Sequence, residues 1–294
     1  QRGARRRRAS AAARRRNRRL SVAEQLARGT AAVASSSSPR ADALLLLAYA
    51  LRRERAWILA NGEAPVLEDD ARNFVGLCAR RNAGEPIAYI LGTAGFYGRE
   101  FLVNQSVLIP RPETEHLVEE ALRFIAGPMR VLDVGTGCGA IACSIAAETP
   151  ARVDGTDLSP AAVELATENA RRLGVSDRCS FQVGDLAEPF RGKRFHVIVA
   201  NLPYIPTADL PQPPDPISFE PREALDGGSD GLTLYRRLLR ELPTLLDTPC
   251  LVLLEAAPPT IGVLAEMTQT AFPSAAVSIV PDYAGLARCV KASL

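Results

Sequence analysis

A glycine-rich run follows an apolar segment near the middle of the chain. The segment RVLDV (130–134) is followed by Gly135, Thr136, Gly137, Cys138 and Gly139. Glycines at the end of a strand allow a tight turn and let a ligand approach bare backbone before the next helix begins. Because the run also satisfies the pattern G-x-G-x-x-G/A, it permits either a nicotinamide dinucleotide or S-adenosylmethionine.

Acidic residues end the next two apolar segments. Asp157 closes the segment 151–157, and a carboxylate there can accept hydrogen bonds from both ribose hydroxyls of either cofactor. The segment 179–183 leads to Asp185 and Leu186. We expect Asp185 to face an adenine amino group, although an acid at this place also suits a simple turn or cap.

A fourth apolar segment, FHVIVA (195–200), leads into Asn201, Leu202, Pro203 and Tyr204. The Asn201 side-chain oxygen and the Leu202 carbonyl can each accept one N–H of a target NH₂ group, and Tyr204 can stack on a flat target. A proline-containing turn after a buried strand is ordinary, but a nicotinamide enzyme has no need of such acceptors. The motif therefore favours S-adenosylmethionine and methyl transfer to a nitrogen. No metal site is expected, because the six Cys are scattered without a C-x-x-C pair and the chain has only two His.

These motifs require a sheet whose strands end at one edge. From residue 129 onward, strand and helix patterns alternate, which predicts an α/β fold with a Rossmann-like, doubly wound parallel sheet. Residues 20–91 show apolar residues at helical spacing and predict a small all-helical domain. Residues 92–110 predict a β-hairpin connector, and residues 111–294 the methyltransferase domain.

Composition excludes several classes of protein. The apolar share is 47% and the longest apolar run covers residues 43–51, about half of the ~20 residues that a membrane span needs. Residues 1–19 hold ten of the 35 basic residues and no acid, so the rest carries 25 basic against 33 acidic residues. An acidic body argues against broad nucleic-acid binding.

The Arg-rich residues 1–19 predict a disordered tail, because dense like charge has no apolar face to bury. Three interpretations stay open. The tail suits a transit peptide, a nucleic-acid-binding arm, or an extension upstream of the true gene start. The first would place the protein in the mitochondrial matrix, whereas we otherwise expect bacterial cytoplasm.

Longer segments resemble one family, the release factor glutamine methyltransferases (PrmC, also called HemK). The resemblance covers about residues 20–294 and rests on GEPIAYILGTAGFYGREFLVNQSVLIPRPETE (84–115), VLDVGTGCGAIA (131–142), NLPY (201–204), FEPREALDGGSDGL (219–232) and VLLEAA (252–257). It implies a helical domain that helps recognise the release factor and a domain that binds S-adenosylmethionine. The implied substrate is the glutamine of the factor's Gly-Gly-Gln motif, and we expect a monomer.

The resemblance also implies roles for the motif residues. The glycine run and Asp157 would bind the cofactor, Asn201 would touch cofactor and glutamine, and residues 202–204 would complete the glutamine site. Three positions depart from the family: Leu202 replaces the usual proline, Leu186 replaces an aromatic, and Ala256-Ala257 follow Glu255 where His-Gly is usual. The alternatives are a ribosomal-protein glutamine methyltransferase, an rRNA adenine methyltransferase and an inactive cofactor-binding scaffold.

Overall fold

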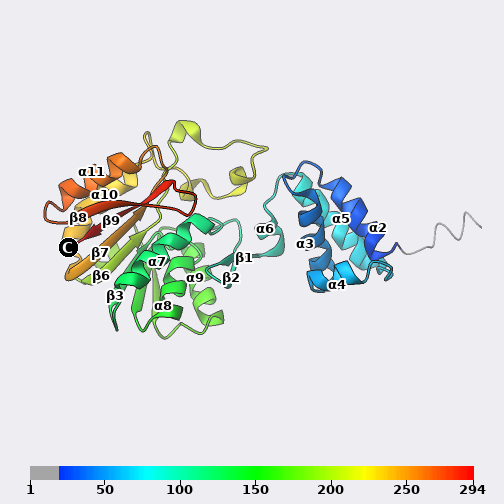
Figure 1. The fold of residues 1–294 in the computed structure, drawn as a ribbon, viewed down its shortest axis with the longest axis horizontal. Helices are drawn as coiled ribbons and strands as arrows, with labels where there is room; N and C mark the ends of the chain where they lie inside the picture. Colours follow the sequence, from blue (N-terminus) through cyan, green and yellow to red (C-terminus); the bar gives the residue numbers. More distant parts are fainter. Residues whose placement is uncertain (1–19) are drawn as a thin grey trace, which may run out of the picture. The chain divides into compact units, whose positions relative to one another are not determined.

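The computed structural model describes residues 20–294 (Figure 1), and the tail predicted at residues 1–19 lies outside the described residues. The chain divides into two compact units, one ending at Leu91 and the other spanning Gly92–Leu294. Within the described part, no helix is long and apolar enough to cross a membrane.

The first unit is all-helical, as predicted. It contains α2 (Val22–Ala32), α3 (Pro39–Leu51), α4 (Arg55–Ala60), α5 (Glu68–Asn82) and α6 (Ile87–Leu91). A capping box between Ser21 and Glu24 begins α2, and Pro39 occupies the first turn of α3. A Cβ on Gly29 would lie 2.2 Å from the Phe74 ring, so glycine is what lets α2 and α5 pack so closely.

The second unit begins with an antiparallel hairpin of β1 (Thr93–Phe96) and β2 (Arg99–Leu102), which agrees with the predicted β-hairpin. A 3₁₀ turn over Pro112–Thr114 then leads into α7 (Glu115–Phe124). The turn matters for the site because it holds Thr114 at the start of α7.

A seven-stranded sheet forms the body of this unit, in the order β5-β4-β3-β6-β7-β9-β8. Its strands are β3 (Arg130–Val134), β4 (Arg152–Asp157), β5 (Cys179–Val183), β6 (Phe195–Ala200), β7 (Leu246–Glu255), β8 (Ala276–Pro281) and β9 (Ala287–Ser293). The strands β3 to β7 are parallel, whereas β9 runs antiparallel to β7 and β8 antiparallel to β9. The doubly wound fold is thus confirmed, with an antiparallel edge added.

Helices cover both faces of the sheet. They are α8 (Ala140–Glu148), α9 (Pro160–Arg172), α10 (Thr233–Glu241) and α11 (Ile261–Ala271), together with α7. Helices α7, α8 and α9 gather on one face, and α10 and α11 on the other (Figure 1). Fully buried side chains of β3, β6 and β7, such as Leu132, Ile198 and Val252, form the core between α10, α11 and the sheet.

The strand order reverses between β3 and β6, which lie side by side with Val134 opposite Ala200. At such a switch point the loops after the two strands lead to opposite faces and leave a crevice between them. The glycine run follows β3 and Asn201 follows β6. The topology therefore brings both motifs to one crevice.

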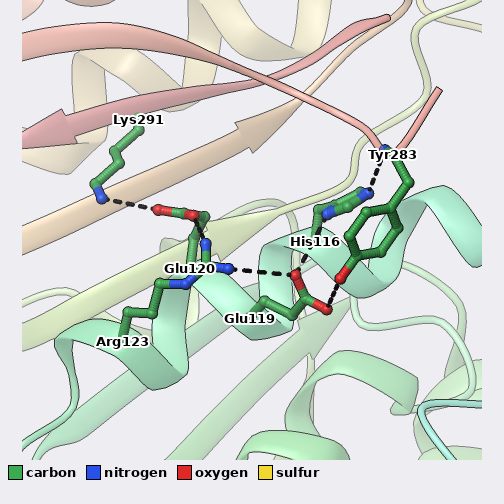
Figure 2. A network of polar contacts seen from close by, with 6 residues as sticks. All are labelled: His116, Glu119, Glu120, Arg123, Tyr283 and Lys291. Carbon is green, nitrogen blue, oxygen red and sulfur yellow. Dashed lines mark hydrogen bonds and ion pairs between the residues drawn. The ribbon is translucent and has the colours of Figure 1, made fainter. Parts of the chain in front are cut away.

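A network of polar contacts joins α7 to β9 and to the loop between β8 and β9 (Figure 2). Lys291 Nζ donates to Glu120 Oε2 at 2.8 Å, and the Tyr283 backbone N–H donates to His116 Nε2 at 3.1 Å. The Tyr283 hydroxyl donates to Glu119, which also lies in α7. These contacts fix α7 against the sheet, and with it the turn that holds Thr114.

Candidate active site

A cavity of about 540 Å³ opens at the carboxyl ends of the parallel strands, within the second unit. Most of the residues selected from the sequence line it. They are Gly135, Thr136, Gly137, Cys138, Asp157, Asp185, Leu186, Asn201, Leu202 and Pro203. Gly139 and Tyr204 do not line it. The structure therefore brings together four loops that lie apart in the sequence.

The three glycines of the run differ in what surrounds them. All three have positive φ, at 75° for Gly135, 55° for Gly137 and 79° for Gly139. A Cβ on Gly135 would lie 2.8 Å from Leu202 Cδ2, and one on Gly139 would lie 3.1 Å from the Cβ of Ala166 in α9. A Cβ on Gly137 would meet nothing within 4 Å. Gly137 is thus the glycine that leaves open space for a ligand, whereas Gly139 lets α8 approach α9.

Asp157 is held by the glycine run itself. Its Oδ2 accepts a hydrogen bond from the Gly137 N–H at 2.9 Å, and its Oδ1 accepts one from the Ser159 N–H at 2.9 Å. Burial raises the pKa of this carboxyl, and the backbone donors act in the opposite direction. Each oxygen keeps a further lone pair, so the carboxylate can still accept from vicinal hydroxyls.

Asp185 and Leu186 form the far wall of the cavity. The Asp185 carboxylate pairs with Arg237, with 2.5 Å between Oδ2 and Nη2, on a part of the surface where both side chains are more than two-fifths exposed. Leu186 is buried and has a φ of 50°, and its carbonyl accepts from Thr156 Oγ1 at 2.7 Å. The wall is therefore aliphatic at Leu186, and the Asp185 carboxylate already has a partner.

The turn after β6 is held from below by Tyr235. The Leu202 N–H donates to the Tyr235 hydroxyl at 3.0 Å, and that hydroxyl donates in turn to the Glu255 carbonyl. Tyr235 is fully buried, and burial raises its pKa well above the ordinary value. The hydroxyl also lies 3.5 Å from the Leu202 oxygen, but its single proton is given to the closer Glu255 carbonyl. The Leu202 carbonyl therefore keeps its capacity to accept a target N–H.

Asn201 is held from the side. Its Nδ2 donates to Thr114 Oγ1 at 3.1 Å, and Thr114 Oγ1 donates to Glu255 Oε1 at 3.2 Å. Tyr204 packs its partly buried ring against the core that contains Tyr235, and burial raises the pKa of Tyr204 to about 12. Thr114, Tyr235 and Glu255 were not selected from the sequence, because their partners lie far away along the chain.

The segment 219–232 supports the same turn through its backbone. The Ile205 N–H donates to the Leu225 carbonyl at 3.0 Å, and the Gly227 N–H donates to the Ile205 carbonyl at 2.8 Å. A Cβ on Gly227 would lie 2.7 Å from the Pro203 oxygen, and one on Gly231 would lie 2.3 Å from the Tyr204 oxygen. The glycines of this segment therefore allow close contact with the backbone of residues 203–204.

An ion pair joins two distant segments beside the cavity. Arg111 Nη2 lies 2.5 Å from Glu220 Oε1, and Glu220 Oε2 accepts from the Ile109 N–H at 3.1 Å. The Glu220 side chain is only 1% exposed, and burial raises its pKa while Arg111 opposes that shift. Arg111 also lines the cavity. Neither residue was given a role from the sequence, although both lie in segments that carried the resemblance.

Comparisons with known proteins agree with this geometry. A model of the PrmC N-terminal domain matches residues 24–92, and a methyltransferase domain model matches residues 131–213. The release factor glutamine methyltransferase of Moorella thermoacetica is 41% identical over 257 residues, which is 86% of this chain and 91% of that protein. The chain belongs to the release factor glutamine methyltransferase family. It is therefore a methyltransferase whose cofactor is S-adenosylmethionine.

Two further members of the family are similar over most of the chain. The release factor glutamine methyltransferase of Geobacter sulfurreducens is 44% identical over 75% of this chain and 78% of its own length. That of Bacillus subtilis is 38% identical over 84% and 89%. A solved methyltransferase structure from Pyrococcus furiosus has a TM-score of 0.51 at 18% identity, covering 67% of this chain and 89% of that one, and shows the shared fold.

The cavity of this methyltransferase fits the cofactor of its family. The open space at Gly137 admits a ligand against bare backbone, and Asp157 offers carboxylate oxygens beside it. The aliphatic wall at Leu186 suits an adenine face. These three features lie at the ends of the neighbouring strands β3, β4 and β5.

Proposed function

We propose that this chain transfers the methyl group of S-adenosylmethionine to the side-chain nitrogen of the glutamine in the Gly-Gly-Gln motif of peptide-chain release factors. The observation that carries the proposal is the position of Asn201 and Leu202, which line the same cavity as the glycine run. The names of the relatives, all release factor glutamine methyltransferases, support the substrate and favour none of the three alternatives.

The site residues divide into two groups. In this proposal, Gly135 to Gly137, Cys138 and Asp157 hold the cofactor, and Asp185 and Leu186 contact its adenine. Asn201, Leu202 and Pro203 hold the glutamine, and Asn201 also touches the cofactor. Tyr204 does not line the cavity and contributes to this site through its packing against the core. Gly139 contributes indirectly by setting the position of α8.

The chemistry asks for alignment more than for a base. An amide nitrogen is a poor nucleophile because its lone pair is delocalised into the carbonyl, while the bound cofactor supplies an electrophilic sulfonium methyl. Asn201 Oδ1 and the Leu202 carbonyl would each accept one N–H and favour the pyramidal nitrogen whose lone pair points at the methyl. Positioning of this kind can supply up to about 7–11 kcal/mol. The amide proton leaves after methylation, when the nitrogen is acidic.

The two units have different roles in this proposal. The helical unit that ends at Leu91 helps recognise the release factor, residues 92–110 connect it, and residues 111–294 carry the reaction. We place the reaction in bacterial cytoplasm, as the cited relatives are bacterial. The mitochondrial matrix would replace it if residues 1–19 were a transit peptide.

Transfer of labelled methyl from S-adenosylmethionine tests the function. A release factor, a ribosomal protein and an RNA are offered separately, and only the release factor is expected to be labelled, at its Gly-Gly-Gln glutamine. Asn201→Ala should lower kcat at least a hundredfold with the Kd of the cofactor nearly unchanged. Gln269→Ala, which removes an amide side chain from α11, is the matched control. Equal activity of Asn201→Ala and wild type would remove Asn201 from the mechanism.

A further inference from the structure

A chain of hydrogen bonds runs from Asn201 into the interior of the second unit. It passes from Asn201 Nδ2 to Thr114 Oγ1 and from Thr114 Oγ1 to Glu255 Oε1. Thr114 is 5% exposed and Glu255 is 2% exposed. The sheet register explains why Asn201 and Glu255 lie close together, because Ala200 lies opposite Leu254. The residues that come next are Asn201, just after β6, and Glu255, the last residue of β7.

The direction of this chain follows from the donors that each group has. A threonine hydroxyl has one proton, and an ionised carboxylate can only accept. With that proton given to Glu255, the Thr114 oxygen can only accept from Asn201. The NH₂ end of the Asn201 amide must therefore face Thr114, and its Oδ1 must face away from it.

We propose that Thr114 and Glu255 are positioning residues that fix the orientation of the Asn201 carboxamide, so that its Oδ1 accepts an N–H of the target. The inference rests on the proposed function, because it assigns the orientation of a residue in the same site. An amide turned the other way would present its NH₂ group to the NH₂ of the target and would reject it. This chain of hydrogen bonds therefore favours a target nitrogen that carries protons.

The ionisation of Glu255 decides the direction. A neutral Glu255 can donate to the Thr114 oxygen, which then donates to Asn201 Oδ1 and turns the amide round. Burial raises the pKa of Glu255 to about 7, and its second oxygen, Oε2, is buried without a hydrogen-bond partner. The productive orientation is therefore expected above pH 7 and is lost as the pH falls through that value.

The charged and titratable groups around Glu255 come from each neighbouring element. Hydrogen bonding from Thr114 and the charge of Arg288 in β9 lower the pKa of Glu255, and Glu113 of the turn before α7 raises it. Asn201 also lowers this pKa as a direct hydrogen-bond partner, which favours the same orientation of its NH₂ group toward the carboxylate. The remaining groups keep their protons near neutral pH because burial raises their pKa values; they are Tyr204, Tyr235 and Cys289. Burial also raises the pKa of Asp133, beside the glycine run, to about 7. A transition near pH 7 is therefore assigned to Glu255 where the substitution Glu255→Gln removes it.

Substitutions of Thr114 test the positioning role. Thr114→Val keeps the shape but removes the hydroxyl, and we expect kcat on the release factor to fall at least tenfold while the Kd of S-adenosylmethionine stays within twofold. Thr114→Ser restores the hydroxyl and should recover most of that loss. Thr268→Val, which removes a buried hydroxyl bonded to its own helix, is the matched control. Wild-type kcat in Thr114→Val would overturn the proposal.

The pH dependence tests Glu255. Wild-type kcat should rise at least fivefold between pH 6 and pH 8 with one ionisation near 7. Glu255→Gln, which can donate or accept at any pH, should be slow and lack this rise. A rise that persists unchanged in Glu255→Gln would contradict the role of Glu255.

A readout without substrate separates this inference from the proposed function. The side-chain ¹⁵N–¹H signals of Asn201, assigned by their loss in Asn201→Ala, should shift with pH around 7 in wild type and stay constant in Glu255→Gln. If wild type shows this shift but methylates no release factor, the proposed function fails and the positioning chain stands. If the signals do not respond to pH, the positioning chain fails whatever the activity.

Discussion

Two glycines of one loop offer a sharp test of the site, because the structure gives them different tasks. Gly137 and Gly139 both have positive φ, so alanine at either costs about 1–2 kcal/mol in backbone strain. An added Cβ at Gly137 would meet no protein atom within 4 Å. An added Cβ at Gly139 would lie 3.1 Å from Ala166 Cβ and 3.3 Å from Ala166 Cα, in α9.

The magnitudes follow from these contacts. Overpacking a dense interior costs about 1–3 kcal/mol, so Gly139→Ala should lose about 3–4 kcal/mol in total. In a unit of this size each kcal/mol shifts Tm by about 2–4 °C, so we expect a fall of about 10 °C for Gly139→Ala and about 4 °C for Gly137→Ala. The new methyl of Gly137→Ala occupies the cavity and should raise the Kd of S-adenosylmethionine at least tenfold.

Thermal unfolding of the cofactor-free protein and calorimetric titration with S-adenosylmethionine measure the two effects separately. Gly139→Ala should bind the cofactor within about threefold of wild type at a temperature where it is folded. The reasoning is refuted if Gly137→Ala binds as tightly as wild type, or if Gly139→Ala loses affinity with no loss of Tm.

Three further predictions concern groups behind and beside the cavity. Tyr235→Phe leaves the Leu202 N–H and the Glu255 carbonyl unpaired, so urea denaturation should show a free energy of unfolding lower by about 3 kcal/mol, and kcat should fall. Arg111→Met leaves the buried Glu220 carboxylate without its partner charge, and denaturation should show a free energy of unfolding lower by about 2 kcal/mol. The double variant Arg111→Met/Glu220→Gln should recover much of this loss. Burial raises the pKa of Asp133 to about 7, so the folded state holds a proton that the unfolded state releases near pH 4, and stability falls as pH rises from 4 to 7. Asp133→Asn should reduce that slope in melts between pH 4 and pH 8.

The cofactor side of the site could be predicted from the sequence because its residues follow strands. Parallel strands end at one edge of the sheet, so the glycine run, Asp157 and Asn201 had to meet once the alternating pattern was recognised. Spacing alone could not separate Gly137 from Gly139. That difference depends on where α9 lies, which is a property of the packing.

The supporting residues could not be predicted, because they act over long separations. Thr114 lies 87 positions from Asn201 and 141 from Glu255, and Arg111 lies 109 from Glu220. Tyr235 sits within an amphipathic helix pattern, where an aromatic residue predicts core packing and no polar role. The strands β8 and β9 were also missed; β8 in particular is largely exposed, so its apolar pattern is weak.

The pairing of Arg111 with Glu220 has a consequence for engineering new specificities. Two distant stretches of sequence meet beside the cavity, and each supplies one member of a charge pair whose glutamate is buried. A chimera that exchanged only the stretch with Arg111 for that of an unrelated methyltransferase would keep the buried Glu220 carboxylate without its partner charge. A transfer of substrate specificity to another scaffold would therefore succeed only when both stretches are transferred together.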